Sequence, residues 1–287
     1  MRAERCRARG RALAALRRWF EAHGYLEIQT PVLVPSPAME EHLSPIEAGG
    51  AFLRTSPEFA LKRVIAAGLG RVYEIGPCFR DREIGPWHRR EFTMCEWYRT
   101  GAELGDLMDE VEALVDEVAR ALGVRPPSWR RATVREIFSE ATGLDPAIAS
   151  ADELSGIDES FDDAFLRRWV SDVEPAMRGA LFVSDWPASQ AALAQVRQAP
   201  GWPVACRFEA YLHGVELANA FLELLDPVEQ RRRFASANAA RLAAGEPPHP
   251  VDEALIEAVG RMPRTSGIAL GFDRLVAALC GWDSIAP

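Results

Sequence analysis

One short stretch of the chain, residues 79 to 99, gathers side chains suited to binding a charged substrate. Two apolar runs, Val72 to Ile75 and Phe92 to Tyr98, bracket a polar segment that contains Gly-Pro. This pattern is typical of two antiparallel strands joined by a long loop. The cationic residues on or beside the loop are Arg80, Arg82, His88, Arg89 and Arg90. Because guanidinium groups bind phosphate oxygens in pairs, the hairpin predicts a nucleotide site without a Walker loop, although a charged run alone is more often solvated surface.

A second group of chemically suited residues lies further along the chain, where glutamates stand in an apolar setting. The segment RFEAYLHGVELANAFLEL contains Glu209, Glu216 and Glu223. Buried carboxylates without a counter-charge are costly, so these three require cationic partners. Carboxylates are the ligands that Mg²⁺ favours when it bridges ATP phosphates. A structural network of ion pairs with nearby arginines is the alternative explanation of the same pattern.

Hydrophobic spacing predicts the elements that position the first group. Apolar residues at helical spacing predict an amphipathic helix over residues 4 to 22, and a strand follows over Tyr25 to Gln29. Residues 32 to 52 favour loop and a short strand. A helix then begins at Thr55-Ser56-Pro57-Glu58, with Thr55 or Ser56 as its cap and Pro57 in its first turn.

The second half of the chain alternates helices and strands. Apolar spacing predicts a long helix from Leu104 to Leu122, ended by Gly123. Helical pieces with acidic linkers follow, and we expect a helical insertion around residues 128 to 180. A buried strand from Leu181 to Ala188 and a pair of strands from Val204 to Leu225 come next. The last predictions are a helix over 226 to 244 and a Gly-rich strand and helix over 267 to 279.

Composition indicates an ordinary globular protein. The 287 residues, 48% of them hydrophobic, are sufficient for a buried core in one large domain or two small ones. No run reaches the ~20 apolar residues of a membrane helix, so we expect a cytoplasmic protein. The five cysteines show neither disulfide nor zinc spacing. A net charge of −9 argues against broad attraction to nucleic acid, although a local basic patch remains compatible with it.

Three segments resemble the signature motifs of class II aminoacyl-tRNA synthetases. FRxxE...HxxEFxxxEWY at residues 79 to 98 is similar to the second motif, and GxALGxDRL at residues 267 to 275 to the third. Residues 24 to 31, with Pro31, resemble the first. The resemblance implies an α+β fold, an antiparallel β-sheet flanked by helices. It also implies a homodimer, because the first helix and strand form the dimer interface in that family.

Longer phrases resemble the elongation factor P–(R)-β-lysine ligase family, which are lysyl-tRNA synthetase paralogues without the anticodon-binding domain. The phrases are TSPEF, EFTMCEWYR, PASQAALAQ, RFEAYLHGVELANAFLEL and SGIALGFDRL, and the similarity covers nearly the whole chain. Ala269 stands where lysyl-tRNA synthetases usually have Gly. The resemblance implies a single catalytic domain over 1 to 287. It further implies that ATP and Mg²⁺ serve to activate (R)-β-lysine, which is then passed to a lysine side chain of elongation factor P, with tRNA not expected as a partner.

The same resemblance implies roles for individual residues. Arg80 and Arg274 are the catalytic residues, and Glu209 and Glu216 are the metal ligands. The implied ATP site comprises Arg80, Asp81, Arg82, Glu83, His88, Arg89, Phe92, Glu216, Leu217, Gly271 and Arg274. The implied amino-acid pocket comprises Ser56, Pro57, Glu58, Glu96, Tyr98, Asn219, Phe221, Glu223 and Ala269. In this assignment Glu58 binds the amino group next to the carboxylate, and Glu223 binds the distal ammonium.

The chain departs from the family pattern at the second motif and at its end. Where the family usually has FRNEE and HNPEF, this chain has FRDRE and HRREF, so arginines stand at positions 82 and 89. Glu83 is the candidate replacement for the lost glutamate, and relatives continue further beyond the third motif. Two alternatives therefore stay open: a stand-alone lysyl-tRNA synthetase-like enzyme that activates L-lysine, and a non-catalytic synthetase-like module. The preference between β-lysine and α-lysine also stays open, because one methyl group shifts selectivity by only ~1 to 3 kcal/mol.

Overall fold

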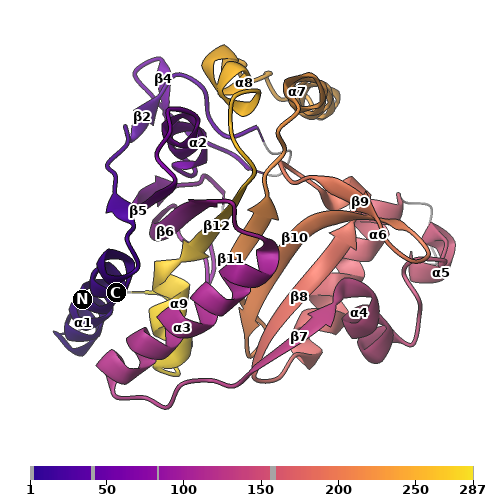
Figure 1. Ribbon diagram of the computed structural model, residues 1–287. Coiled ribbons are helices and arrows are strands. Elements are labelled where there is room, and N and C mark those ends of the chain that lie inside the picture. The colour runs from indigo at the N-terminus through magenta and orange to yellow at the C-terminus, as the bar shows by residue number, and fades with distance from the viewer. Residues whose placement is uncertain (1–2, 40–42, 83, 156–159, 287) are drawn as a thin grey trace.

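The computed structural model describes residues 3–39, 43–82, 84–155 and 160–286, and a large twisted sheet runs through its centre (Figure 1). In spatial order its strands are β1 (Leu26–Glu27), β5 (Arg71–Phe79), β6 (Glu91–Thr100), β12 (Thr265–Gly271), β11 (Val215–Leu222), β10 (Pro203–Leu212), β8 (Ala180–Pro187) and β7 (Trp129–Thr133). The short strand β9 (Val196–Gln198) pairs with β10. Neighbouring strands from β5 to β8 are antiparallel, whereas the edge strands β1 and β7 lie parallel to their neighbours.

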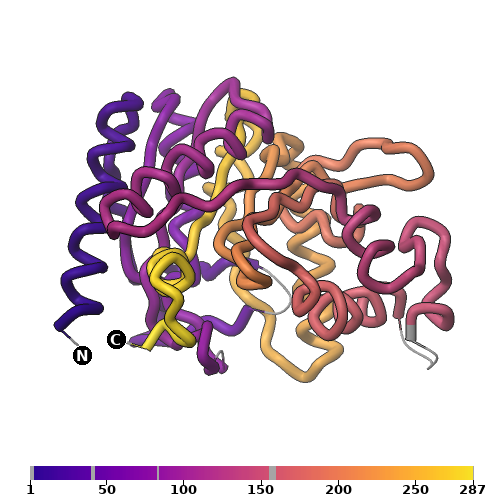
Figure 2. Tube along the Cα trace, turned by 90° about the horizontal axis from the view of Figure 1, so that it is seen from below, coloured from indigo at the N-terminus to yellow at the C-terminus, as the bar shows by residue number. Residues whose placement is uncertain are grey.

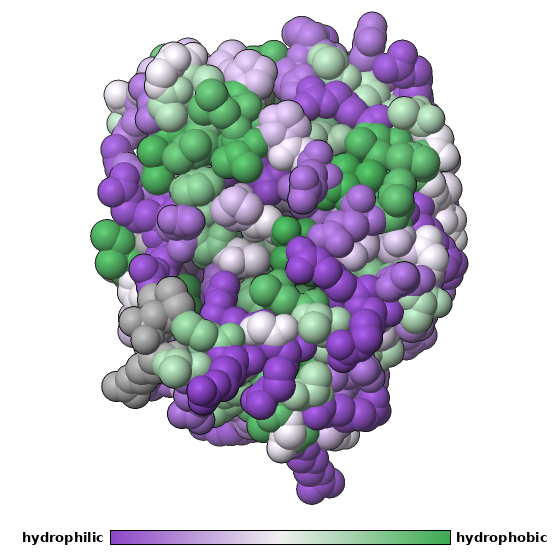
Figure 3. Space-filling view, turned by 90° about the vertical axis from the view of Figure 1, so that its left-hand side faces the viewer, coloured by the Kyte–Doolittle hydropathy of each residue, from purple (hydrophilic) through white to green (hydrophobic). Residues whose placement is uncertain are grey.

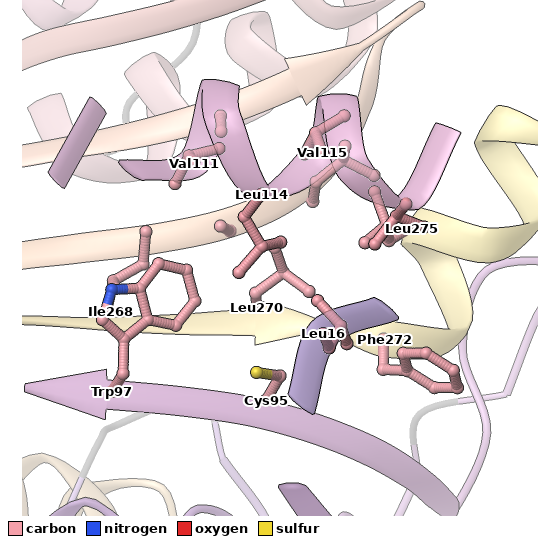
Figure 4. Packing of buried hydrophobic residues seen from close by; sticks show 14 of the residues in the cluster. Leu16, Cys95, Trp97, Val111, Leu114, Val115, Ile268, Leu270, Phe272 and Leu275 are labelled. Atoms are coloured by element: carbon pink, nitrogen blue, oxygen red, sulfur yellow. The ribbon is translucent and has the colours of Figure 1, made fainter. Parts of the chain in front are cut away.

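Three helices cover one face of this sheet: α1 (Ala3–Ala22), α3 (Leu104–Leu122) and α9 (Phe272–Leu279). Gly123 ends α3 as predicted, at φ 78°, and Glu103 and Asp106 form a capping box at its start. The apolar stripe of α3 packs with α1 and α9 on the inward side chains of β6 and β12 (Figure 4). This is the main hydrophobic core, and it leaves the opposite face of the same strands for other uses.

The opposite face is partly covered by α2 (Glu58–Ala66), with α8 (Glu253–Val259) and α7 (Pro227–Ala243) beyond it (Figure 1). Leu61 and Ile65 of α2 pack on Val72 and Tyr98, which point away from the main core. A small sheet of β2 (Leu33–Val34), β4 (Ala51–Leu53) and β3 (Ile46–Ala48) lies next to α2. Sequence spacing predicted only one short strand in this region, because strands of two or three residues show no period.

The described residues between 128 and 180 pack against β8 and β10 around a second hydrophobic cluster. The segment is not helical throughout: β7 opens it as a strand parallel to β8, and α4 (Val134–Thr142), α5 (Ala151–Ser155) and α6 (Phe161–Arg168) follow. A π-helical turn (Trp169–Val173) and a 3₁₀ turn (Glu174–Ala176) lead back to β8. Apolar spacing did not predict β7, because two exposed arginines stand in the middle of this strand.

Both ends of the described chain lie side by side, as Figure 2 shows from below. The guanidinium group of Arg5 donates a hydrogen bond of 3.2 Å to the carbonyl of Ser284 and lies 4.5 Å from the ring centre of Trp282. Among the residues that the structure describes, none of the helices has the length and apolarity needed to cross a membrane.

Candidate active site

The floor of the candidate site is formed by the sheet face that points away from the main core. Glu96, Ala269, Asn219 and Glu209 face one another in a row across β6, β12, β11 and β10. Because side chains alternate along a strand, positions two residues away form a second row of Tyr98, Gly267, Phe221 and Arg207. Strand β12 therefore contributes only Gly267 and Ala269 to these two rows, so that a hollow remains between the larger side chains of β6 and β11.

A β-bulge brings Glu216 to the same face. The pairing of β10 with β11 shifts between Ala210 and Tyr211, so that Tyr211 pairs with Glu216. Without the shift, Leu217 would hold this place, and Leu217 instead contributes to the main core. Bulges commonly re-aim a side chain next to a site, and here the bulge turns a carboxylate toward the cavity.

The hollow is a cavity of about 300 Å³ that most of the predicted site residues line. Those that line it are Ser56, Glu58, Arg80, His88, Arg89, Phe92, Glu96, Tyr98, Glu216, Leu217, Asn219, Phe221, Glu223, Ala269, Gly271 and Arg274. Lining residues that the sequence analysis did not name are Trp87, Thr93, Met94, Gly267, Ile268, Asp273 and Ile285. Gly267 and Asp273 stand inside the third motif, so the motif itself was a signal for them.

A few predicted residues lie away from the cavity lining. Arg82, whose side chain is 70% exposed, forms an ion pair with Glu246 at 3.0 Å, and Asp81 pairs with Arg90. Pro57 borders a smaller neighbouring pocket, where it precedes α2. Glu209 stands behind the cavity on β10, and Glu83 lies outside the described residues. The predictions for the four described positions are therefore not supported by direct contact with the cavity, and the role of Glu83 stays a prediction.

One end of the cavity is acidic and buried, and Glu96 lies at its centre. The hydroxyl of Ser56 donates a hydrogen bond of 2.7 Å to this carboxylate, and the hydroxyl of Tyr98 donates one of 2.9 Å. Burial raises the pKa of Glu96 to about 8, and the negative charge of Glu58 adds to this effect against the two hydrogen bonds. A positively charged ligand next to Glu96 would therefore stabilise the ionised form of this carboxyl group.

The other two carboxylates of this end share one cation within the chain. The Nζ atom of Lys62 lies 2.5 Å from Oε1 of Glu58 and 2.6 Å from Oε2 of Glu223. Burial acts to lower the pKa of Lys62, but the two carboxylates outweigh it and raise the pKa above its ordinary value. The sequence analysis did not name Lys62. Its position four residues after Glu58 on a predicted helix was the available signal.

Two acceptor atoms at this end are buried without a hydrogen-bond partner among the described residues: Oε1 of Glu223 and Oδ1 of Asn219. The Glu223 atom lies over Gly267, where an added Cβ would come within 2.4 Å of it. Buried acceptors normally have donors, so each unpartnered atom favours a ligand that donates hydrogen bonds. An ammonium group has three donors and a positive charge.

The other end of the cavity is cationic. Arg274, in the first turn of α9, donates hydrogen bonds to the carbonyls of Trp87 and Glu216 at 3.1 and 3.0 Å. Its guanidinium group also lies 3.1 Å from Oε2 of Glu216 and 2.7 Å from Nε2 of His88. Arg80 lies over the ring of Phe92 at 5.2 Å from the ring centre. These groups come from the hairpin loop and from α9, which the fold brings together.

Of the two carboxylates predicted to bind Mg²⁺, Glu216 lines the cavity at the cationic end and Glu209 lies behind it. Glu209 is buried, forms an ion pair with Arg207 and accepts a hydrogen bond from Tyr211. Burial raises the pKa of Glu209 to about 8 against the effect of Arg207, and the nearby charge of Glu216 adds to the rise. Within the described residues no cluster of three or more metal-ligating side chains occurs. Glu216 lines the cavity, and its carboxylate fits a Mg²⁺ ion that ATP phosphates would also hold, which is the usual way proteins bind this ion. Both oxygens of Glu209 are engaged by Arg207 and Tyr211, so the prediction of Glu209 as a direct ligand is not supported by this geometry.

The last described residues border the cavity next to the hairpin loop. The backbone N–H of Ile285 donates a hydrogen bond of 2.8 Å to the carbonyl of Pro86 in the hairpin loop, and Ile285 lines the cavity. On the same side, a carboxylate oxygen of Asp273 accepts a hydrogen bond of 2.6 Å from the backbone of Thr93. The loop that carries the cationic residues is therefore tied to the C-terminal segment.

Comparison with known proteins agrees with this geometry. The model of the family described as tRNA synthetases class II (D, K and N) matches residues 2–287. A relative from Proteus mirabilis, named elongation factor P–(R)-β-lysine ligase, is 37% identical over 97% of this chain and 91% of its own length. A relative of the same name from Edwardsiella ictaluri is 38% identical over 93% of this chain and 88% of its own length. The resemblance and the α+β fold class expected from the motifs are thereby confirmed. The chain belongs to the class II tRNA synthetases of the D, K and N type, and within them to the elongation factor P–(R)-β-lysine ligase family.

Proposed function

We propose that this protein uses ATP to activate (R)-β-lysine as an adenylate and transfers it to a lysine side chain of elongation factor P. The relatives named for this reaction match almost the whole chain. The observation that carries the proposal is one cavity with a buried acidic end, which includes the unpartnered Oε1 of Glu223, and a cationic end at Arg274. This arrangement suits a diammonium carboxylic acid at one end and a polyphosphate at the other.

The first step is an attack of a carboxylate oxygen of the amino acid on the α-phosphorus of ATP, with pyrophosphate as the leaving group. No proton has to move in this step, so positioning and cationic stabilisation of the phosphates suffice. Arg80 binds the α-phosphate and the carboxylate, and Arg274 and His88 bind the outer phosphates. Phe92 supports the adenine ring.

Glu216, with Glu209 behind it, holds the Mg²⁺ ion in this proposal. When bound, the ion neutralises part of the charge on the phosphates. Arg274 lies between this carboxylate pair and His88, so it connects the metal ligands to the phosphate-binding loop.

The acidic end selects the amino acid. Glu58 binds the amino group nearest the carboxylate, and Glu223 and Asn219 bind the distal ammonium with the acceptor atoms that are unpartnered in the described part of the chain. Phe221 and Tyr98 flank the aliphatic part of the substrate. A substrate amino acid with an uncharged, apolar side chain would leave these buried acceptor atoms without hydrogen-bond donors.

In the second step, the neutral amine of the acceptor lysine attacks the activated carbonyl carbon. An amide bond forms, AMP leaves with the electron pair of the broken C–O bond, and the amine loses a proton to solvent. Elongation factor P supplies this amine, and a lysine isomer supplies the carbonyl.

We also propose a homodimer through the side of the molecule that carries α1, β1 and β2. Hydrophobic side chains gather in patches on the face that Figure 3 shows. Leu26 on β1 and Leu33 on β2 are 51% and 53% exposed, and β1 is an edge strand of the large sheet. Exposed apolar residues on an edge strand are typical of a surface that another chain covers.

The decisive experiment measures amino-acid-dependent exchange of pyrophosphate into ATP, with (R)-β-lysine and L-α-lysine compared in parallel. Exchange that is well above background with (R)-β-lysine, followed by a mass increase of purified elongation factor P, is the expected result. A preference for L-α-lysine, with charging of tRNA, would assign the protein to lysyl-tRNA synthesis instead. No exchange with either amino acid would overturn both enzymatic assignments.

A further inference from the structure

Lys62 is the one lysine of the sequence, and the proposed reaction gives this buried charged group at the acidic end no role. It projects from α2, its side chain is 1% exposed, and its ammonium group lies between Glu58 and Glu223. Those are the two carboxylates to which the proposed function assigns the two ammonium groups of the substrate. Lys62 itself does not line the cavity, so it supports these carboxylates from behind.

The charges of this end match a diammonium substrate only when Lys62 is included. Glu58, Glu96 and Glu223 are all buried, and Lys62 neutralises one of three negative charges. Two negative charges then remain for the two ammonium groups of a lysine isomer. Because unpaired buried charges are strongly destabilising, this balance decides which substrates fit.

Lys62 also keeps its two partners close together. The nearest oxygens of Glu58 and Glu223 each lie within 2.6 Å of the same nitrogen, so they are no more than about 5 Å apart. Two buried negative charges at such a distance repel each other, and a cation between them offsets this repulsion. With Nζ in place, each carboxylate uses one oxygen for Lys62 and keeps the other for a ligand.

We propose that Lys62 is a positioning and specificity-determining residue: it is a built-in cation that holds the carboxylates of Glu58 and Glu223 in place at the cavity and neutralises one negative charge, so that this end accepts two substrate ammonium groups. The inference rests on the proposed function, because it concerns the amino-acid pocket of that reaction. It adds Lys62 to the amino-acid pocket, and it adds the condition that the charge of Lys62 sets how many ammonium groups the pocket accepts.

The electrostatics of Glu223 support this role. Burial raises the pKa of Glu223 to about 7, and the charge of Lys62 keeps it from rising further, while Glu58 acts in the opposite direction. The groups that face Glu223 are Lys62 and Glu58 from α2 and Tyr98 from β6, with Glu96 next to them. Removal of the Lys62 charge therefore raises the pKa of Glu223, and the protonated form no longer attracts an ammonium group.

The test compares Lys62→Met with wild type in pyrophosphate exchange. We expect the KM for (R)-β-lysine to rise about 10- to 100-fold, as for loss of a charged contact, with the KM for ATP within about threefold of wild type. We also expect the half-maximal point of kcat/KM for (R)-β-lysine to move to higher pH by about one unit or more. Lys62→Arg keeps the charge and should restore most of the pH profile.

Arg54→Met is the matched control, because Arg54 and Glu74 form another buried ion pair, at 2.6 Å with side-chain exposures of 2% and 4%. Glu74 pairs with Glu96 across the strands, but neither Arg54 nor Glu74 lines the cavity. The Arg54→Met variant should lower the melting temperature as Lys62→Met does, without changing the ratio of the two KM values or the pH profile. Lys62→Gln, which keeps hydrogen-bond donors without the charge, replaces Lys62→Met if that variant does not fold.

The outcomes separate this inference from the proposed function. Exchange by wild type with a lysine isomer, together with an unchanged KM and pH profile in a folded Lys62 variant, would overturn the role of Lys62 alone. Equal changes in Arg54→Met would also overturn it, since the effect would then be general destabilisation. Absence of exchange in wild type would overturn the proposed function, and binding of lysine isomers by calorimetry would then decide the role of Lys62 from affinities.

Discussion

The two ends of the cavity use the same kinds of charged group in opposite surroundings. At the acidic end, Glu58, Lys62, Glu96 and Glu223 are between 0% and 6% exposed. At the cationic end, the side chains of Arg274 and Glu216 are 20% and 37% exposed. Burial raises the pKa of Glu96 to about 8 and that of Glu223 to about 7. The acidic end is therefore a preformed, charge-balanced pocket, whereas the cationic end is open to a large, flexible polyphosphate.

This contrast follows from the elements that build each end. Strands β6, β11 and β12 and helix α2 enclose the acidic end, and these elements pack on hydrophobic clusters. A loop and the first turn of α9 build the cationic end, where water reaches the charges and screens them. Substitutions at the two ends should therefore differ in which kinetic constant they change.

The largest expected effect is at the cationic end. Arg274→Ala removes a guanidinium group that contacts Trp87, His88 and Glu216, and it removes a donor from the phosphates in the transition state. We expect pyrophosphate exchange to fall by about 10² to 10³-fold, mainly in kcat. Arg231→Ala is the control, because Arg231 pairs with Glu253 on the surface. An Arg274→Ala enzyme with unchanged kcat would show that this end only binds and does not stabilise the reaction.

At the acidic end, Glu223→Gln should act on substrate affinity instead. The amide keeps the shape of the carboxylate but removes the charge, and Lys62 loses one of its two partners. We expect the KM for (R)-β-lysine to rise about 100-fold, with the KM for ATP nearly unchanged. Parallel titrations of both substrates measure this. A similar rise in both KM values would contradict the division of the cavity into two ends.

Gly267→Ala tests how tightly the acidic end is built. An added Cβ would come within 2.2 Å of Cε1 of Tyr98 and 2.4 Å of Oε1 of Glu223. We expect a loss of about 1 to 3 kcal/mol in the free energy of unfolding, measured by urea denaturation, together with weaker lysine binding. Gly105→Ala is the control, since nothing lies within 4 Å of its added Cβ, and it should be neutral or stabilising. Equal free energies of unfolding for Gly267→Ala and Gly105→Ala would mean that the pocket accommodates the added methyl group without strain.

The pH dependence should have opposite signs for stability and for lysine binding. The pKa values of Glu96 and Glu223, about 8 and about 7 in the folded protein, lie above the ordinary value of 4.5, so the folded state binds more protons than the unfolded state between these limits. The free energy of unfolding should therefore fall by about 1 kcal/mol or more as pH rises from about 5 to about 8.

Glu174 and Glu209 act in the same direction, because burial raises the pKa of Glu174 to about 7 and that of Glu209 to about 8. The increase in melting temperature caused by (R)-β-lysine should grow over the same range, because ionised carboxylates bind the ammonium groups. Thermal scans at several pH values, with and without the amino acid, measure both trends. A lysine-induced shift that is independent of pH would contradict the raised pKa values.

The smallest effect is expected for Arg82→Ala. The sequence placed Arg82 in the ATP site, but its side chain is 70% exposed and pairs with Glu246. Exposed ion pairs contribute little, and we expect the KM for ATP to change by less than about threefold. A large rise in the KM for ATP would indicate that Arg82 contributes to nucleotide binding and that the cationic end extends toward the surface.

Sequence spacing predicted the long elements correctly. The helices α1 and α3, the hairpin of β5 and β6, the strand pair β10 and β11 and the final β12 with α9 all appear within a few residues of their predicted limits. The prediction was incomplete for β7 and the small sheet of β2 to β4, because short strands with exposed side chains show no alternating pattern. The strand expected over 25 to 29 is reduced to Leu26–Glu27.

The sequence by itself determined which residues are available for chemistry and in what order, since motif residues can be recognised from their types and spacing. Only the tertiary structure decided which charges meet. Register across β6, β12, β11 and β10 aligns Glu96, Ala269, Asn219 and Glu209, and one bulge turns Glu216 to their face. The packing of α2 places Lys62 against Glu223, a residue far away in the chain. Such partners are set by strand pairing and burial, which act between distant segments and leave no local pattern in the sequence.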